Sequence, residues 1–301
     1  MILRTLAFAS LFLVAAPAPA QQKKAAPALA PAIAAKVEVR RDLAYVENGH
    51  ERQKLDIYLP KERSAAPVPL IVWIHGGGWE GGNKDGCPFA MFATQGYVVA
   101  SINYRLSKHA LYPAQLEDCQ AALKWLRSKA KEFNVDPAKV GVGGASAGGH
   151  LAALVGTAGA KTTDSDGVKV QAVVDIFGPA NFLTIWPQSG PDTVIKHNEL
   201  NSPEGRLFGG PIPEKQELAK QASPTTYVCK ECPPFLILHG KQDRLVPWKQ
   251  SQELHEALEK AGATSELILV DDAGHDGKVA GPNMSKINAF FQKNLGKPAG
   301  K

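Results

Sequence analysis

Short runs of consecutive apolar residues recur along this 301-residue chain, and helical stretches separate several of them. Such runs occur at 70–74, 97–102, 172–176 and 235–238. A strand that is apolar along its whole length is covered on both faces, as in parallel sheets. Because parallel strands need crossover connections, which are usually helices, the alternation predicts an α/β fold with a mostly parallel central sheet and helices on both faces.

Other segments complete this alternating pattern. Residues 54–59 alternate polar and apolar side chains, as in an early half-buried strand, and shorter strands are expected at 140–142 and 266–270. Apolar residues recur at steps of three or four within 112–133, which predicts an amphipathic helix, and a second helix is expected at 249–261.

The region 181–221 interrupts the alternation, because it contains several Pro and Gly residues and has no regular apolar period. In a chain of this type, an irregular insertion between strands usually covers the site at the end of the sheet. We therefore predict a single folded domain over 37–297, with a small cap-like insertion at 181–221.

Residues 1–20 have the pattern of a secretory signal peptide. A positive charge precedes an apolar run at 6–16, and the small-x-small sequence APA follows at 18–20. A membrane anchor is the alternative, but about 20 apolar residues are needed to span a bilayer and this run is shorter. We expect cleavage near Ala20, a secreted or periplasmic protein without a membrane span, and a disordered leader at 21–36.

The charge balance argues against nucleic-acid binding. Lys plus Arg total 34 and Asp plus Glu total 29, so the formal net charge is +5. An excess of this size, spread over the chain without a long basic run, does not mark a nucleic-acid-binding surface. The expected partner is a small molecule or a polymer-linked substrate.

Residues 144–148 read GASAG and fit the G-x-S-x-G pattern, in which the serine is a nucleophile. Chance alone gives roughly 0.1 matches in a chain of this length, so the context decides. A strand is predicted before the motif at 140–142, and a helix-like run follows it. So sharp a turn needs small residues around Ser146, and it raises the serine oxygen at a helix start. The alternative is a glycine-rich helix start with a capping serine.

Residues 75–78 read HGGG directly after the predicted strand 70–74. Glycines let such a loop aim backbone N–H groups at one point, where they stabilise the oxyanion of an acyl-transfer intermediate. Gly77 and Gly78 are the candidate donors, and the N–H of Ala147 would complete the oxyanion hole. The alternative is a phosphate-binding loop, but neither a Gly-Lys-Ser/Thr ending nor G-x-G-x-x-G at the first strand is present.

A serine nucleophile needs a base, and the base needs an acid that orients it. Asp243 follows the predicted strand 235–238, and His275 follows the predicted strand 266–270. Both residues therefore fall at strand ends after Ser146, in the order Ser, Asp, His. We predict that Asp243 is the acid and His275 the base.

Four other residues could compete for these roles. Asp271 and Asp272 are too close in sequence to His275 to come from a strand end of their own. His75 precedes the serine in the chain, and His239 comes before a strand-end glycine. Both histidines are therefore expected to organise loops rather than to act as the base.

These motifs resemble the α/β-hydrolase fold and, within it, the serine esterases and lipases that carry HGGG. The sequences YVVASINYRL at 97–106, GASAGGH at 144–150 and HGKQDRLVP at 239–247 are similar to the bacterial feruloyl-esterase-type (BD-FAE-like) branch. The resemblance covers about 37–295 and implies an α/β-hydrolase catalytic domain that needs no cofactor. The triad it implies consists of Ser146, Asp243 and His275.

The resemblance also implies a function. It suggests an exported serine carboxylic-ester hydrolase that acts on short-chain or hydroxycinnamoyl esters, including those of plant cell-wall polysaccharide, as feruloyl and acetyl-xylan esterases do. The segment 185–199 departs from the family pattern and is expected to line the substrate cleft, with Trp186 as a candidate contact. Trp79, beside the glycine loop, offers either an aromatic face to a substrate ring or a buried packing role.

Two other functions fit the same fold. A peptidase of the prolyl-oligopeptidase type usually carries a large N-terminal propeller, whereas only 1–36 precede this domain. A non-catalytic binding domain typically lacks the serine or the histidine, and both are present here.

The four cysteines are Cys87, Cys119, Cys229 and Cys232, and the last two form a C-x-x-C motif. Such a motif can be a redox pair or half of a zinc site. Here it precedes a strand rather than a helix, and zinc would need two more ligands nearby. Because disulfides are common in exported proteins, we predict a Cys87–Cys119 bond and, as a second pair, Cys229–Cys232, with no metal site.

Overall fold

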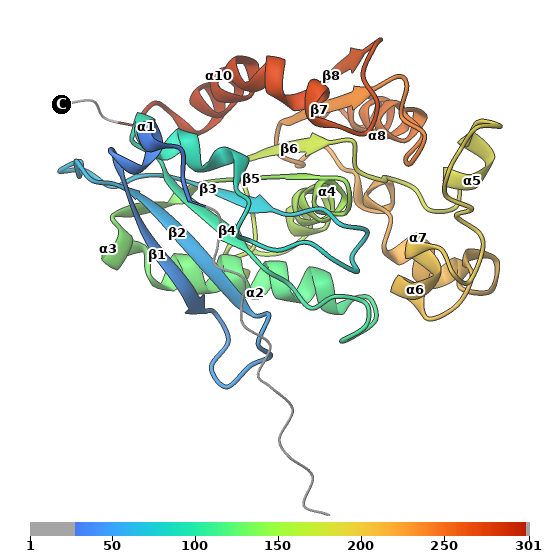
Figure 1. The fold of residues 1–301 in the computed structure, drawn as a ribbon, viewed down its shortest axis with the longest axis horizontal. Helices are drawn as coiled ribbons and strands as arrows, with labels where there is room; N and C mark the ends of the chain where they lie inside the picture. Colours follow the sequence, from blue (N-terminus) through green and yellow to red (C-terminus); the bar gives the residue numbers. More distant parts are fainter. Residues whose placement is uncertain (1–27, 299–301) are drawn as a thin grey trace, which may run out of the picture.

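The computed structural model describes residues 28–298. The predicted signal peptide at 1–20 and the first part of the leader lie outside this range. The described residues form an eight-stranded sheet in the order β1-β2-β4-β3-β5-β6-β7-β8 (Figure 1). β1 pairs antiparallel with β2, β2 pairs antiparallel with β4, and the other pairs are parallel. The predicted α/β-hydrolase-type architecture is therefore confirmed.

The strands match the expected apolar runs to within a few residues, except that β1 was not expected and β5 is much longer than its run. They are β1 (Val37–Ala44), β2 (Lys54–Pro60), β3 (Val68–Ile74), β4 (Val98–Ile102), β5 (Val135–Ala145), β6 (Ala172–Ile176), β7 (Phe235–Gly240) and β8 (Ser265–Val270).

Helices connect the strands, and several short ones lie in the connections. The α-helices are α1 (Pro31–Ala34), α2 (Ala114–Ser128), α3 (Ala130–Phe133), α4 (Ala147–Ala160), α5 (Ile185–Gln188), α6 (Pro203–Phe208), α7 (Gln216–Gln221), α8 (Lys249–Lys260), α9 (Gly277–Ala280) and α10 (Met284–Leu295). The 3₁₀ helices are η1 (Pro88–Gln95), η2 (Asp164–Asp166), η3 (Ile212–Glu214), η4 (Pro224–Tyr227) and η5 (Gly281–Asn283).

Each face of the sheet has its own apolar core, because successive side chains of a strand point to opposite faces. On one face, residues such as Val72 and Val142 pack with apolar residues of α2, α4 and α8. On the other, residues such as Trp73 and Val174 pack with those of η1 and α10. Figure 1 shows α2 and α10 on opposite sides of the sheet. Both faces are thus buried, which explains the uninterrupted apolar runs of the central strands.

The predicted functional residues follow the C-terminal ends of four parallel strands. β3 leads into the glycine loop, β5 into Ser146, β7 into Asp243 and β8 into His275. Because parallel strands end at the same edge, these four segments are brought together. The insertion at 181–221 lies between β6 and β7 and contains only short helices, α5, α6, η3 and α7.

The leader is ordered in its last part, which corrects the expectation of disorder for residues 28–36. This stretch contains α1, and the side chains of Leu29 and Ile33 pack against the core beside η1 and α10. Burial of these two apolar side chains favours an ordered segment over a free one. In the part of the chain described here, no helix combines the length and apolar character that crossing a bilayer requires.

The predicted Cys87–Cys119 disulfide is wrong. Cys87 packs against the core on the η1 and α10 face of the sheet, whereas Cys119 lies in the core on the α2 and α4 face. The sheet separates the two thiols, and both are free. Cys229 and Cys232 are also free thiols, although their Sγ atoms are in contact at 3.6 Å, which is longer than the roughly 2.05 Å of a disulfide bond.

Candidate active site

Ser146 occupies the turn between β5 and α4. Its backbone has φ +56° and ψ −125°, a conformation that non-glycine residues rarely adopt. The Ser146 N–H donates to Ile176 O at 2.9 Å, which fixes the turn against β6. The residue lines a cavity of about 420 Å³ at the strand ends. A strained, half-buried serine that lines a cavity at this place is the arrangement that the G-x-S-x-G motif predicts.

The glycines of this motif are required by close backbone contacts. A Cβ atom on Gly144 would lie 2.2 Å from Gly148 O, and a Cβ atom on Gly148 would lie 2.1 Å from Ile74 O. Both distances are far below van der Waals contact. The first turn of α4 therefore packs directly onto the end of β3, which brings Ser146 beside the glycine loop.

The glycine loop adopts backbone conformations that favour glycine. Gly77 has φ +112° and Gly78 has φ +59°. Among residues 28–298, no acceptor receives a hydrogen bond from the N–H of Gly77 or Gly78. Ala147 is the first residue of α4, where an N–H has no partner within its helix. All three residues line the cavity that contains Ser146, so their N–H groups are available to an oxyanion there.

His75 organises this loop, as expected. Its Nδ1 donates to Gly76 O at 2.7 Å, and its ring stacks on Tyr104 with the centroids 4.4 Å apart. Arg52 donates to His75 Nε2 at 3.0 Å and to Gly82 O at 3.0 Å. Burial lowers the pKa of His75 to about 4, so this histidine is neutral at neutral pH.

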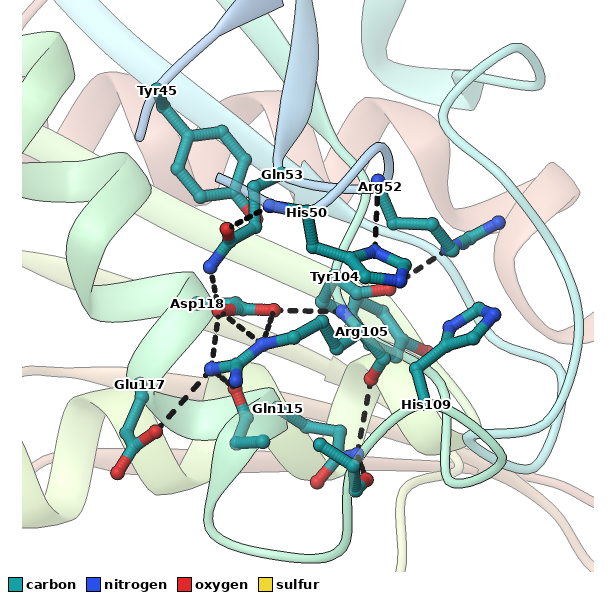
Figure 2. A network of polar contacts seen from close by, with 12 residues as sticks. Tyr45, His50, Arg52, Gln53, Tyr104, Arg105, His109, Gln115, Glu117 and Asp118 are labelled. Atoms are coloured by element: carbon teal, nitrogen blue, oxygen red, sulfur yellow. Dashed lines mark hydrogen bonds and ion pairs between the residues drawn. The ribbon is translucent and has the colours of Figure 1, made fainter. Parts of the chain in front are cut away.

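Sequence reasoning missed Arg52 and the polar network behind it. Buried Asp118 on α2 accepts from Gln53 Nε2 at 2.7 Å and from the Arg105 N–H at 2.7 Å, and it pairs with the Arg105 guanidinium (Figure 2). Arg52 directly precedes Gln53 in the β1–β2 connection, and it also donates to Tyr104 O at 2.9 Å. The network therefore fixes the β1–β2 connection relative to the segment after β4. His75 lies between Arg52 of the first segment and Tyr104 of the second.

His275 and Asp243 form a hydrogen-bonded pair. His275 Nδ1 lies 2.6 Å from Asp243 Oδ2, and His275 lines the same cavity as Ser146. Asp243 Oδ1 accepts from the N–H groups of Leu245 and Val246 at 2.8 and 2.9 Å. Burial alone would raise the pKa of the Asp243 carboxyl, but hydrogen bonds from the histidines outweigh it and hold that pKa well below its usual range.

The competing residues lie elsewhere or have other partners. Asp271 is 82% exposed and pairs with Lys241, and Asp272 is exposed as well. His239 is buried, with Nδ1 2.7 Å from Ser251 Oγ and Nε2 close to both Val246 O and Asp243 Oδ2. His239 therefore organises the loop after β7, as expected, and it also holds the carboxylate that contacts His275.

The two candidate substrate contacts have different positions. Trp79 lies in the cavity wall, but its side chain is 2% exposed and packs edge-on against His150 and Phe182. Its Nε1 donates to His150 Nδ1 at 3.2 Å, so the indole has the packing role and offers no free aromatic face. Trp186 on α5 is 39% exposed and is not among the residues that line the cavity.

Sequence reasoning also missed most of the cavity wall. Ile195, Pro203 and Glu204 come from the insertion, which confirms that the segment 181–221 reaches the site. The irregular sequence of that segment gave the only signal. Within residues 28–298, no group of three or more His, Cys, Asp and Glu side chains is placed to hold a metal ion. The remaining wall residues are Gly76, Glu80, Ala145, Phe177, Pro179, Leu245 and Val246.

A buried carboxyl lies beneath the first turn of α4. Asp175 on β6 is fully buried, and its Oδ1 accepts from the Gly178 N–H at 2.9 Å. A Cβ atom on Gly149 would lie 2.4 Å from the same oxygen, so the helix passes directly over it. Burial raises the pKa of Asp175 to about 7, although the Gly178 hydrogen bond opposes this shift.

Replacing Asp175 with Asn should therefore change how stability depends on pH. The pKa of Asp175 is higher in the folded state than in the unfolded state, so the folded protein binds this proton more tightly. The resulting stabilisation is fully present below about pH 4 and is lost as pH rises toward 7. The free energy of unfolding of Asp175→Asn, minus that of the wild type, should rise by a few kcal/mol between pH 4 and pH 7, at roughly 1.4 kcal/mol per pKa unit. Urea unfolding at several pH values measures it, and a constant difference would contradict the assignment.

Comparisons with known proteins agree with this fold and site. Residues 55–258 match the family model described as BD-FAE. Esterase LipC of Mycobacterium tuberculosis is 30% identical over 257 residues, covering 80% of this chain and 62% of LipC. Esterase LipQ of the same organism is 29% identical over 230 residues, covering 74% of this chain and 53% of LipQ. The chain thus spans about half to three fifths of the length of these curated relatives.

Solved structures give the same result. A truncated carbohydrate esterase from gut microbiota superposes with a TM-score of 0.76 at 32% identity, over 86% of this chain and 97% of that one. The bifunctional GH43-CE protein of Bacteroides eggerthii superposes with a TM-score of 0.77 at 32% identity, over 86% of this chain and 38% of that one. Since the family model covers most of the chain, from the second strand into α8, the chain belongs to the BD-FAE family.

Proposed function

We propose that the protein is a serine carboxylic-ester hydrolase that works through an acyl-enzyme. The observation that carries this proposal is the shared cavity, which both Ser146 and His275 line, with His275 Nδ1 2.6 Å from Asp243 Oδ2. A serine, a base and an orienting carboxylate are the groups that nucleophilic acyl transfer requires. The names of the relatives, which include esterases and a carbohydrate esterase, support the same activity.

In the first half-reaction, Ser146 Oγ bonds to the carbonyl carbon of the ester, and His275 takes the hydroxyl proton at Nε2. The carbonyl electron pair moves to oxygen, where the N–H groups of Gly77, Gly78 and Ala147 stabilise the negative charge. When this intermediate collapses, the bond from carbon to the alkoxy oxygen breaks. His275 gives its proton to that oxygen, and the free alcohol leaves acyl-Ser146 behind.

In the second half-reaction, water replaces the alcohol. His275 takes a proton from the water as the oxygen bonds to the acyl carbon, and the same N–H groups stabilise the new oxyanion. Collapse breaks the bond to Ser146 Oγ, which recovers its proton from His275, and the carboxylic acid leaves. Asp243 keeps the other imidazole proton on Nδ1 throughout and stabilises the charged ring.

The proposed substrates are short-chain or hydroxycinnamoyl esters, including esters attached to plant cell-wall polysaccharide. The cavity, at about 420 Å³, is near the lower end of the roughly 300–1,000 Å³ of small-molecule sites. Apolar side chains such as Phe177, Ile195 and Leu245 line it. The helices of the described insertion have at most six residues, so none of them resembles a long amphipathic lid. The pattern of residues 1–20 supports a further proposal, export to the periplasm or beyond.

A substrate panel tests this function. The kcat/KM for acetyl to butyryl esters, or for methyl ferulate, should exceed that for palmitoyl esters at least about tenfold, roughly 1.4 kcal/mol of transition-state discrimination. p-Nitrophenyl esters of increasing chain length, methyl ferulate and a peptide amide measure it in one buffer. A preference for palmitoyl esters would indicate a lipase, and a preference for the peptide would indicate a peptidase.

A further inference from the structure

Two acidic side chains line the candidate catalytic cavity, and they differ in their partners. Glu80, just after the glycine loop, is paired through both carboxylate oxygens with the Arg206 guanidinium of α6. Glu204, at the start of α6, is 2% exposed, and only one of its carboxylate oxygens contacts another side chain. The two residues therefore present the same functional group to one cavity, but only the Glu80 carboxylate is saturated.

Glu204 is held from one side by a histidine. Its Oε1 lies 3.0 Å from Nδ1 of His197, which is fully buried. Its Oε2 is buried and accepts no hydrogen bond from residues 28–298, and His197 Nε2 also has no partner in that range. A buried carboxylate oxygen without a donor costs free energy, and such groups in native proteins call for an explanation, of which a ligand-binding role is one.

The local fold fixes this pair beside the glycine loop. Ser202 caps α6 by accepting from the Gly205 N–H at 2.9 Å, and its hydroxyl donates to His197 O at 3.0 Å. Pro203 lies against the loop, because a Cβ atom on Gly78 would be 3.3 Å from the Pro203 Cβ. Glu204 is therefore anchored next to the residues that would bind the oxyanion, where a bound ester has to pass.

We propose that Glu204, oriented by His197, accepts a hydrogen bond from a hydroxyl group of the substrate. An ionised carboxylate only accepts hydrogen bonds, so the ligand group must be a donor. A hydroxyl offers one donor to Oε2, the one carboxylate oxygen that accepts no hydrogen bond from residues 28–298. An ammonium group would need partners for three N–H bonds, and the walls around Glu204 are otherwise largely apolar. This inference rests on the proposed ester hydrolysis and names its preferred class, esters that carry a free hydroxyl group within reach of Glu204.

The hydroxyl could belong to the alcohol, as in a sugar or polyol ester, or to the acyl group, as in a hydroxycinnamate. Two matched pairs distinguish these sources. Hydroxyethyl acetate against propyl acetate places the hydroxyl on the alcohol, and methyl p-coumarate against methyl 4-methylcinnamate places it on the acyl group. For each pair, the ratio of kcat/KM values is divided by the ratio of the hydroxide-catalysed rates, which removes differences in intrinsic reactivity.

The wild type should prefer the hydroxylated member of at least one pair by about tenfold or more, since a buried acceptor discriminates strongly against an analogue that lacks the donor. Glu204→Gln and Glu204→Leu should reduce that ratio at least fivefold. Glu80→Gln is the matched control: it removes a charge from the same cavity, but Glu80 is saturated by Arg206, so the ratio should persist.

Three results would overturn the inference. One is a wild-type ratio near one for both pairs, which needs no variant and so does not depend on how the variants fold. Another is a ratio that survives in a folded Glu204→Leu protein. The third is an equal loss of selectivity in Glu80→Gln. If no ester in either pair is hydrolysed at all, the proposed function fails instead, so the two failures are distinguishable.

Discussion

Ser146→Ala is expected to lower kcat for ester hydrolysis by about 10³- to 10⁶-fold and to leave a folded protein. Without the Oγ atom, no acyl-enzyme can form, and only the oxyanion donors and substrate binding can still assist water. The fold should survive, because alanine tolerates the φ of +56° as well as serine does, and the turn is fixed by the backbone bond to Ile176 O. Initial rates on p-nitrophenyl acetate and a thermal unfolding curve measure both effects.

A fluorophosphonate probe provides the matching control. It should label the wild type at one site, which peptide mapping should place at Ser146, and it should fail to label Ser146→Ala. A wild type that hydrolyses esters but carries the label on another serine would show that Ser146 is not the nucleophile. A wild type that neither reacts with the probe nor hydrolyses esters would point to a binding domain on the hydrolase fold.

The central strands and the serine turn could be predicted because local constraints decide them. β3, β4, β6 and β7 are buried on both faces, so selection for burial leaves continuous apolar runs in the sequence. The glycines around Ser146 are set by close backbone packing, because a Cβ atom on Gly144 or Gly148 would lie 2.2 or 2.1 Å from a backbone oxygen. In both cases, the residue type follows directly from the space that is available.

β1 could not be recognised because it lies at the edge of the sheet. Half of its eight residues are charged, and pairs such as Arg40 with Glu38 lie on its exposed side. An irregularity in its pairing with β2, between Arg40 and Leu43, further breaks the alternation of polar and apolar residues. An edge strand needs only part of one face buried, so its sequence carries a weak signal.

Contacts between distant segments could not be predicted from the sequence, for another reason. Which face of the sheet receives Cys87 and which receives Cys119 depends on the path of two connections, and spacing alone says nothing about it. The same holds for Arg52, which reaches His75 from another connection. Trp79 illustrates the ambiguity of an aromatic residue near a site, since either packing or substrate contact fits the pattern.

Asp243→Asn should have the second large effect, a fall in kcat of about 10⁴-fold, because the substitution reverses the polarity of one hydrogen bond. The amide oxygen can still accept from the N–H groups of Leu245 and Val246, as Oδ1 does in the wild type. The amide nitrogen then faces His275 Nδ1, which must accept rather than donate. The imidazole proton moves to Nε2, where it blocks the transfer from Ser146.

Asp272→Asn is the matched control, because it changes a carboxylate close to His275 in sequence but exposed and outside the cavity. It should keep kcat within about twofold of the wild type, as surface substitutions away from a site usually have small effects. Rates on p-nitrophenyl acetate across pH 6–9 compare the three proteins, and a wild-type-like unfolding curve for Asp243→Asn separates lost chemistry from lost structure. If Asp272→Asn were the crippling substitution and Asp243→Asn stayed active, the acid that orients His275 would be Asp272, despite the 2.6 Å contact with Asp243.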